Sequence, residues 1–118
     1  MGITGECQLL RIFIGEEDRY EGNPLYEAIV HKVKEAELAG VTVLRGIEGY
    51  GAGKIIHKDS LQGLVQLSKD RPVVIEIVDN TERIQKILSV IDPMVTKGLI
   101  TQENVNIIAY RHIEESAA

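Results

Sequence analysis

Four stretches of the chain are rich in β-branched and aliphatic residues, in the alternating or nearly continuous pattern that strands show. They cover residues 8–14, 41–48, 72–79 and 105–113. Short runs of this kind, bounded by glycine, proline or polar residues, are typical of β-strands. The stretch at 72–79 is the clearest, because it is almost wholly apolar and follows a polar segment.

Apolar residues recur at three- and four-residue spacing between the first two strands and again between the last two, which predicts two helices. The two sets are Leu25, Ala28, Ile29, Val33 and Ala36, and then Ile84, Ile87, Leu88 and Ile91. The expected boundary residues are Asn23 as the N-cap, Pro24 as the first helical residue, Gly40 just after the first helix, Asn80 or Thr81 as the second cap, and Asp92-Pro93 as an interruption.

The predicted elements follow one another in the order β-α-β-β-α-β. This order indicates a ferredoxin-like α+β fold, in which two helices cover one face of a four-stranded antiparallel sheet. A long polar segment at about 51–70 separates the second and third strands, and a loop of that length often carries function. We expect one domain over residues 1–118, with a core at about 8–113 and frayed ends.

The strands are apolar on both faces, although helices cover only one. On the third predicted strand, Val73, Ile75 and Ile77 face one side, and Val74 and Val78 face the other. An antiparallel sheet with one face in water normally has one polar face. The sequence therefore favours an oligomer that buries the second face, and the alternative is a monomer that tolerates an exposed apolar face.

Composition and charge exclude several classes of protein. Of the 118 residues, 44% are hydrophobic and 26% are charged, as in ordinary soluble domains. The net charge of −5 argues against binding nucleic acid through overall charge. We find no membrane-spanning run and no signal peptide, and the single cysteine, Cys7, fits a reducing cytoplasm. We therefore expect a cytoplasmic protein without direct membrane insertion.

A glycine-rich segment at 49–54, with the sequence GYGAGK, follows the second predicted strand. It matches neither the phosphate loop of P-loop enzymes nor the dinucleotide-binding GxGxxG pattern. Closely approaching backbone N–H groups and the charge of Lys54 could still bind an anion. The alternative is a bulge or hinge at the base of the long loop.

Other candidate groups are weaker. His31, His57 and His112 lack the spacing of metal ligands, so we expect no metal site. Glu17 and Asp18, in an acidic stretch that begins at Glu16, could act as an acid–base pair. The sequence favours a solvated loop or a contact between subunits over that pair. A catalytic role for Cys7 is the weakest of these ideas.

Several of these segments together resemble a small PII-like family, a domain of unknown function in bacteria and archaea. They read GEEDRY at 15–20, GNPLYEAIV at 22–30, AGVTVLRG at 39–46 and GYG at 49–51. The strand at 72–79 and the pair Tyr110-Arg111 fit the same pattern. The resemblance runs from about Leu9 to Arg111, nearly the whole chain.

The resemblance implies a homotrimer of ferredoxin-like subunits that binds an adenine nucleotide in the clefts between subunits and has no catalytic activity. It also implies that the segment at about 51–70 relays occupancy to a partner, with a membrane transporter or a fluoride channel as candidates. By position, the residues that the resemblance places at the nucleotide are Arg45, Gly49, Tyr50, Gly51, Gly53, Lys54, Val78, Gly98 and Arg111.

The chain departs from PII proteins after the second helix. Their glycine- and lysine-rich loop, which wraps the phosphates, is here reduced to residues 95–99. The resemblance therefore implies AMP or ADP rather than ATP. Two alternatives stay open: a CutA-like trimer that binds metal through His57 and His112, and a small nucleotide-hydrolysing enzyme that uses Glu17 and Asp18.

Overall fold

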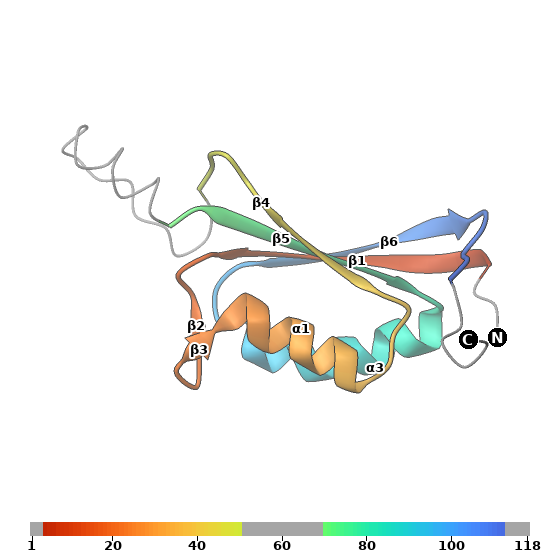
Figure 1. Ribbon diagram of the computed structural model, residues 1–118, viewed down its shortest axis with the longest axis horizontal. Helices are drawn as coiled ribbons and strands as arrows, with labels where there is room; N and C mark the ends of the chain where they lie inside the picture. The colour runs from red at the N-terminus through yellow and green to blue at the C-terminus, as the bar shows by residue number, and fades with distance from the viewer. Residues whose placement is uncertain (1–3, 51–69, 113–118) are drawn as a thin grey trace.

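The computed structural model describes residues 4–50 and 70–112, and these form a sheet with two helices on one face (Figure 1). The sheet is antiparallel, with the strand order β4-β5-β1-β6. Its strands are β1 (Gly5–Gly15), β4 (Val41–Arg45), β5 (Pro72–Asp79) and β6 (Leu99–Ile107). The other elements are α1 (Leu25–Glu35), α3 (Thr81–Ile91), the 3₁₀ turn η1 (Asp92–Met94) and the short pair β2 (Arg19–Tyr20) and β3 (Asn23–Pro24). The predicted ferredoxin-like α+β fold is confirmed.

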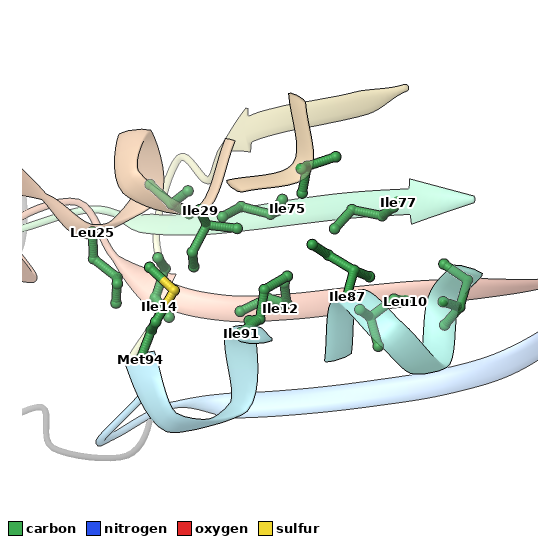
Figure 2. Packing of buried hydrophobic residues seen from close by; sticks show 13 residues of the cluster. Leu10, Ile12, Ile14, Leu25, Ile29, Ile75, Ile77, Ile87, Ile91 and Met94 are labelled. Carbon is green, nitrogen blue, oxygen red and sulfur yellow. The ribbon is translucent and has the colours of Figure 1, made fainter. Parts of the chain in front are cut away.

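The core lies between the sheet and the helices (Figure 2). On β5 the alternation is strict, so that Val73, Ile75 and Ile77 are buried against the helices. Their partners on β1 include Ile12, which lies opposite Ile75. Ile29 of α1 is also fully buried. Fully burying an aliphatic side chain of this size stabilises a fold by about 1.5–3 kcal/mol, so this layer holds the helices on the sheet.

The start of α1 differs from the prediction. Asn23 does not cap the helix, because its backbone pairs with Tyr20 in the β2–β3 hairpin. The two residues between them, Glu21 and Gly22, have φ values of 50° and 85°, as a type I′ turn requires. Pro24, predicted as the first helical residue, takes the N-cap position instead and makes no side-chain cap.

The end of α1 also differs, since Gly40 is not its C′ residue. Glu37 takes the left-handed conformation, with φ 60°. Its N–H donates to the Lys34 carbonyl, and the Leu38 N–H donates to the Val33 carbonyl, which is the Schellman arrangement. The helix therefore ends three residues earlier than the glycine signal suggests. The prediction for α3 is confirmed, because the Asn80 side chain accepts a hydrogen bond from the Arg83 N–H.

The last strand was predicted at 105–113, but β6 covers Leu99–Ile107. The middle of this strand is the polar run Gln102, Glu103 and Asn104, which has no apolar alternation. These side chains have polar partners on β1: Gln8 contacts both Gln102 and Asn104. Polar pairs between β1 and β6 thus stand where the sequence prediction of a strand requires alternating apolar residues. The second predicted strand, 41–48, also ends earlier, at Arg45.

The sheet face away from the helices is apolar around one charged row, as predicted. Val74 lies opposite Phe13 on β1 and opposite Leu44 on β4, all three on this open face. At its centre, Arg11 donates to Glu76 and to Glu103, each at 2.9 Å. The hydrogen bond that Arg11 donates to Glu76 raises the pKa of Arg11 above its ordinary value. Among the described residues, no helix has the length and hydropathy to span a membrane.

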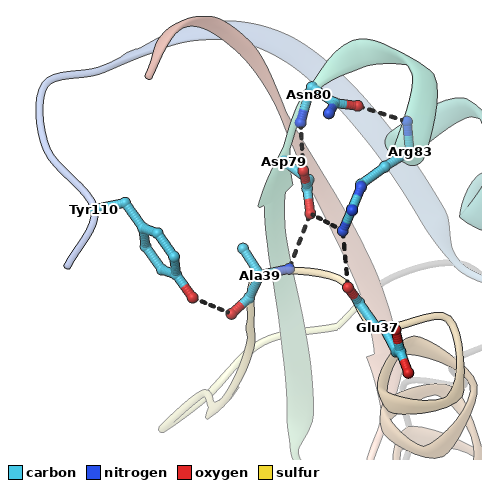
Figure 3. A network of polar contacts seen from close by, with 6 residues as sticks. All are labelled: Glu37, Ala39, Asp79, Asn80, Arg83 and Tyr110. Carbon is cyan, nitrogen blue, oxygen red and sulfur yellow. Dashed lines mark hydrogen bonds and ion pairs between the residues drawn. The ribbon is translucent and has the colours of Figure 1, made fainter. Parts of the chain in front are cut away.

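A buried carboxylate joins the ends of three elements (Figure 3). Asp79, at the end of β5, is fully buried. Its oxygens accept hydrogen bonds from the Ala39 N–H at 2.9 Å and the Asn80 N–H at 2.7 Å. Arg83 lies 3.9 Å from the same carboxylate and donates to the Glu37 carbonyl at 2.8 Å. Asp79 therefore fixes the loop between α1 and β4 against the start of α3.

We predict that Asp79→Ala lowers the free energy of unfolding by about 2–4 kcal/mol, because two backbone donors lose their buried acceptor. Urea denaturation measures this loss. Glu82→Ala, in the exposed first turn of the same helix, is the matched control, and we expect a loss below about 1 kcal/mol. Equal losses in the two variants would contradict the role assigned to Asp79.

Candidate functional site

A cleft of about 530 Å³ lies on the open face, at the end of the sheet where the chain leaves β4 and enters β5. Its apolar floor includes Phe13, Val74 and Leu99, from three neighbouring strands. Backbone-rich turns form its rim: residues 46–50 after β4, and Lys97 with Gly98 before β6. We call this hollow the first cleft. An apolar floor with a polar, glycine-rich rim suits a flat ring that carries a polar group.

Two glycines of this rim are required by close approach. A Cβ on Gly98 would lie 2.6 Å from the Phe13 carbonyl oxygen, and the φ of Gly98 is 144°. A Cβ on Gly46 would lie 2.7 Å from Cγ of Pro72, whose carbonyl accepts the Gly46 N–H at 2.7 Å. These glycines let the turns lie directly against β1 and β5. The rim therefore presents backbone to the cleft.

The charges in the first cleft are few. The lining side chains with a charge are Lys97, Asp18 and Glu48. Lys97 Nζ lies 4.0 Å from Asp18 Oδ1, and the other oxygen of Asp18 accepts the Gly15 N–H at 2.9 Å. Lys97 is half exposed, so its ammonium can turn toward a ligand. Within the described lining, one cation faces two carboxylates.

A second hollow of about 410 Å³ lies at the other end of the open face. Its lining includes Thr42 of β4, Glu76 and Val78 of β5, and Ala39 of the preceding loop. Tyr110, which follows β6, completes the wall. Among the described residues, the first cleft and this second hollow share no lining residue. Both open on the sheet face that the helices leave uncovered.

The structure brings together some of the predicted site residues and separates others. Gly49, Tyr50 and Gly98 line the first cleft. Val78 lines the second hollow, and Arg111 is exposed just beyond it, after Tyr110. Gly51, Gly53 and Lys54 lie outside the described residues, as does His57 of the metal alternative.

Arg45 does not face the first cleft. Its guanidinium donates to both carboxylate oxygens of Glu16, with Nε at 3.1 Å from Oε1. This hydrogen bond raises the pKa of Arg45. By register Arg45 lies opposite Val73, on the helix-covered side of the sheet, whereas the cleft floor lies on the open side. Its proposed phosphate contact is therefore not supported in the single chain.

The acidic stretch anchors the base of the segment between β4 and β5. Besides the Glu16–Arg45 pair, the Glu16 N–H donates to the Arg71 carbonyl at 2.8 Å. The Glu17 N–H donates to Asp70 at 2.9 Å. These contacts join the turn after β1 to both ends of that segment. Glu16 is thus neither simply solvated nor free for acid–base chemistry.

The other candidate groups gain no support from the described residues. No group of three His, Cys, Asp or Glu side chains that could hold a metal occurs in 4–50 or 70–112. Cys7 is 2% exposed, and burial raises the pKa of its thiol. A reactive cysteine needs the opposite, an accessible thiol with a lowered pKa. Sequence analysis did not assign Gly46, Asp18 or Lys97 to the candidate nucleotide site, although all three line the first cleft.

The residues of the cleft and the strands belong to a stretch that matches a known family. The family model DUF190, described as "Uncharacterized ACR", matches residues 7–107. The chain belongs to the DUF190 family. A UPF0166 protein from Aquifex aeolicus (strain VF5) is 44% identical over 101 residues, which cover 86% of this chain and 92% of the relative. The predicted PII-like family is thereby confirmed.

Solved structures show the same fold at low identity. CPII from Thiomonas intermedia K12, bound to ADP and bicarbonate, has a TM-score of 0.61 at 13% identity, over 86% of this chain and 88% of that one. The same protein bound to ADP, AMP and acetate has a TM-score of 0.61 at 14% identity, over 87% and 89%. CPII is described as a nitrogen regulatory PII-like protein. The DUF190 chain therefore has a PII-like fold.

We predict that Gly98→Ala lowers the free energy of unfolding by about 2–3 kcal/mol, since a Cβ there meets the β1 backbone in a conformation that favours glycine. Thermal and urea denaturation measure the loss. The control is Gly40→Ala, where a Cβ meets nothing within 4 Å. We expect its stability to change by less than about 0.5 kcal/mol. A similar small change in Gly98→Ala would contradict the close approach.

Proposed function

We propose that this DUF190 protein is a regulatory protein that binds an adenine nucleotide and relays its occupancy to a partner. The observation that carries the proposal is the first cleft, with its apolar floor, glycine-built rim and single lysine at the base of the segment between β4 and β5. The bound ADP and AMP of CPII, a protein of the same fold, support it.

The two hollows suggest how a complete site forms. In one chain, the turns that suit phosphate lie at one end of the open face, and Val78 with Arg111 lies at the other. A ring of copies that buries the open faces head to tail sets the first cleft of one subunit against the second hollow of the next. A homotrimer is the ring that the family resemblance implies. The apolar open face would supply the contact area.

The charges of the first cleft favour a ligand with few phosphates. Lys97 is balanced by Asp18 and Glu48. Each added phosphate brings negative charge toward those two carboxylates, and like charges raise the free energy of binding. AMP or ADP is therefore a better ligand than ATP. The short turn at 95–98 offers few donors to a triphosphate.

The relay follows from how the cleft and the acidic turn are joined. Asp18 lines the cleft, and its neighbours Glu16 and Glu17 contact Arg45, Arg71 and Asp70 at both ends of the segment between β4 and β5. A ligand that draws Lys97 away from Asp18 would remove a contact of the acidic stretch at 16–18. It shifts the segment only if it binds two arrangements with different affinity. The partner, a transporter or channel in our proposal, would recognise that segment.

Calorimetric titration with AMP, ADP, ATP and cyclic AMP tests the ligand. We predict micromolar binding of AMP or ADP, and about tenfold weaker binding of AMP by Lys97→Ala, because a hydrogen bond to a charged group contributes about 1.5–3 kcal/mol when intact. Adenosine, which has no phosphate, should bind the wild type and Lys97→Ala with equal affinity. Lys86→Ala, on the exposed side of α3, is the control. No binding at millimolar ligand would overturn the proposal, and release of phosphate would indicate the hydrolase.

We predict that Leu44→Asp abolishes oligomer formation, because it puts a charge on the open face. Leu44 is 47% exposed in the single chain, and Val90 on α3 is 42% exposed. Val90→Asp is therefore a matched control, and it should leave the mass unchanged. Light scattering coupled to size exclusion measures both. A wild-type monomer, or loss of the oligomer in Val90→Asp alone, would contradict assembly through the open face.

A further inference from the structure

The chain continues past the last strand of the sheet. β6 pairs with β1 as far as Ile107, which lies opposite Gly5. Residues 108–112 then leave the sheet (Figure 1). Ile108 is 83% exposed, so apolar packing of that side chain does not hold the segment in place. Its position must come from other contacts.

A hydrogen bond ties this segment to the body of the protein. Tyr110 Oη donates to the Ala39 carbonyl oxygen at 3.1 Å (Figure 3). The N–H of the same residue, Ala39, is held by the buried Asp79 carboxylate at 2.9 Å. Ala39 is thus fixed from the interior and offers its carbonyl to the outside. Tyr110 also packs against His112, with ring centroids 5.5 Å apart.

The tied segment forms part of the second hollow. Ala109 and Tyr110 belong to its lining, together with Ala39, Val41 and Val78. The tyrosine–carbonyl bond therefore joins two parts of the lining across the hollow. Breaking this bond would free the wall that residues 108–112 provide. Arg111 follows Tyr110 directly and carries an exposed positive charge.

We propose that residues 108–112 are a strap closed over the second hollow, that Tyr110 latches it on Ala39, and that the latch sets Arg111 for the phosphate of a bound nucleotide. The inference rests on the proposed function. Tyr110 is a positioning residue, since it acts through Arg111 and through the shape of the hollow. Asp79 supports the latch because it holds the N–H of Ala39, the residue whose carbonyl accepts the Tyr110 hydroxyl.

The expected change in nucleotide affinity on loss of the latch follows from how far the strap is pre-organised in its closed form. The affinity of a site that exists only while the strap is closed is reduced by the fraction of time that it is open. An intramolecular hydrogen bond contributes a net 0.5–1.5 kcal/mol, so loss of the Tyr110 hydroxyl lowers the ratio of closed to open strap by about two- to tenfold. The ring remains in Tyr110→Phe, which isolates the hydroxyl from the apolar wall.

Binding of AMP and adenosine by Tyr110→Phe tests the latch and its link to Arg111. We expect weaker AMP binding, by no more than the roughly two- to tenfold change in the closed-to-open ratio, and a smaller ratio of AMP to adenosine affinity than in the wild type. A wall that only packs against the base would lower both affinities equally. In the Arg111→Gln background, Tyr110→Phe should no longer change that ratio. Tyr20→Phe, in the β2–β3 hairpin, is the control.

Trypsin cleavage after Arg111 tests closure without any ligand. Cleavage of a local open state follows its population, so release of residues 112–118 should be about two- to tenfold faster in Tyr110→Phe at an unchanged melting temperature. Equal cleavage rates in the wild type and Tyr110→Phe would overturn the latch. If the wild type binds no nucleotide, the proposed function and the role of Arg111 fall together, whereas the cleavage rates still decide the latch.

Discussion

The pairing of β1 with β5 is the constraint on which the rest of the structure depends. Ile12 faces Ile75 and Arg11 faces Glu76, so one register assigns every side chain of both strands to a face. If β1 slipped by one residue against β5, Arg11 would enter the core and Ile12 would move to the open face. The helices, the charged row and both hollows are therefore fixed by the same choice of register.

The ends of this strand pair determine where a ligand can bind. At the start of β5, Pro72 lies so close to Gly46 that the turn offers backbone instead of side chains. At the end of β5, the buried Asp79 accepts hydrogen bonds from the loop before β4 and from the start of α3. The first cleft thus has an apolar floor with backbone groups at its rim, and the second hollow is lined by side chains of β4, β5 and the segment after β6. Two unlike hollows on one face are compatible with the proposed head-to-tail assembly, whereas a self-complementary pair would place like against like.

The alternating strand at 72–79 and the helical spacing of the isoleucines were enough to predict the fold, because burial imposes those patterns directly. The hairpin at 19–24 and the polar middle of β6 were not predictable, since a type I′ turn through Glu21 and side-chain pairs such as Gln8–Asn104 leave no apolar pattern. The resemblance named Gly49, Tyr50 and Gly98, which the structure places around the first cleft. It did not indicate the pairing of Arg45 with Glu16 in the single chain, because nothing in the sequence shows that contact.

Because Arg45 pairs with Glu16 in the single chain, Lys97 is the only cationic side chain of the first cleft within its described lining. With Lys97 beside Asp18 and Glu48, this lining provides little net attraction for phosphate. In the proposed function, affinity would therefore come from backbone donors, from the apolar floor and from groups of another copy, such as Arg111. A site of such modest affinity would change its occupancy as the ligand concentration varies. A regulatory protein of the proposed kind needs that response, whereas a tight site would stay occupied at every concentration.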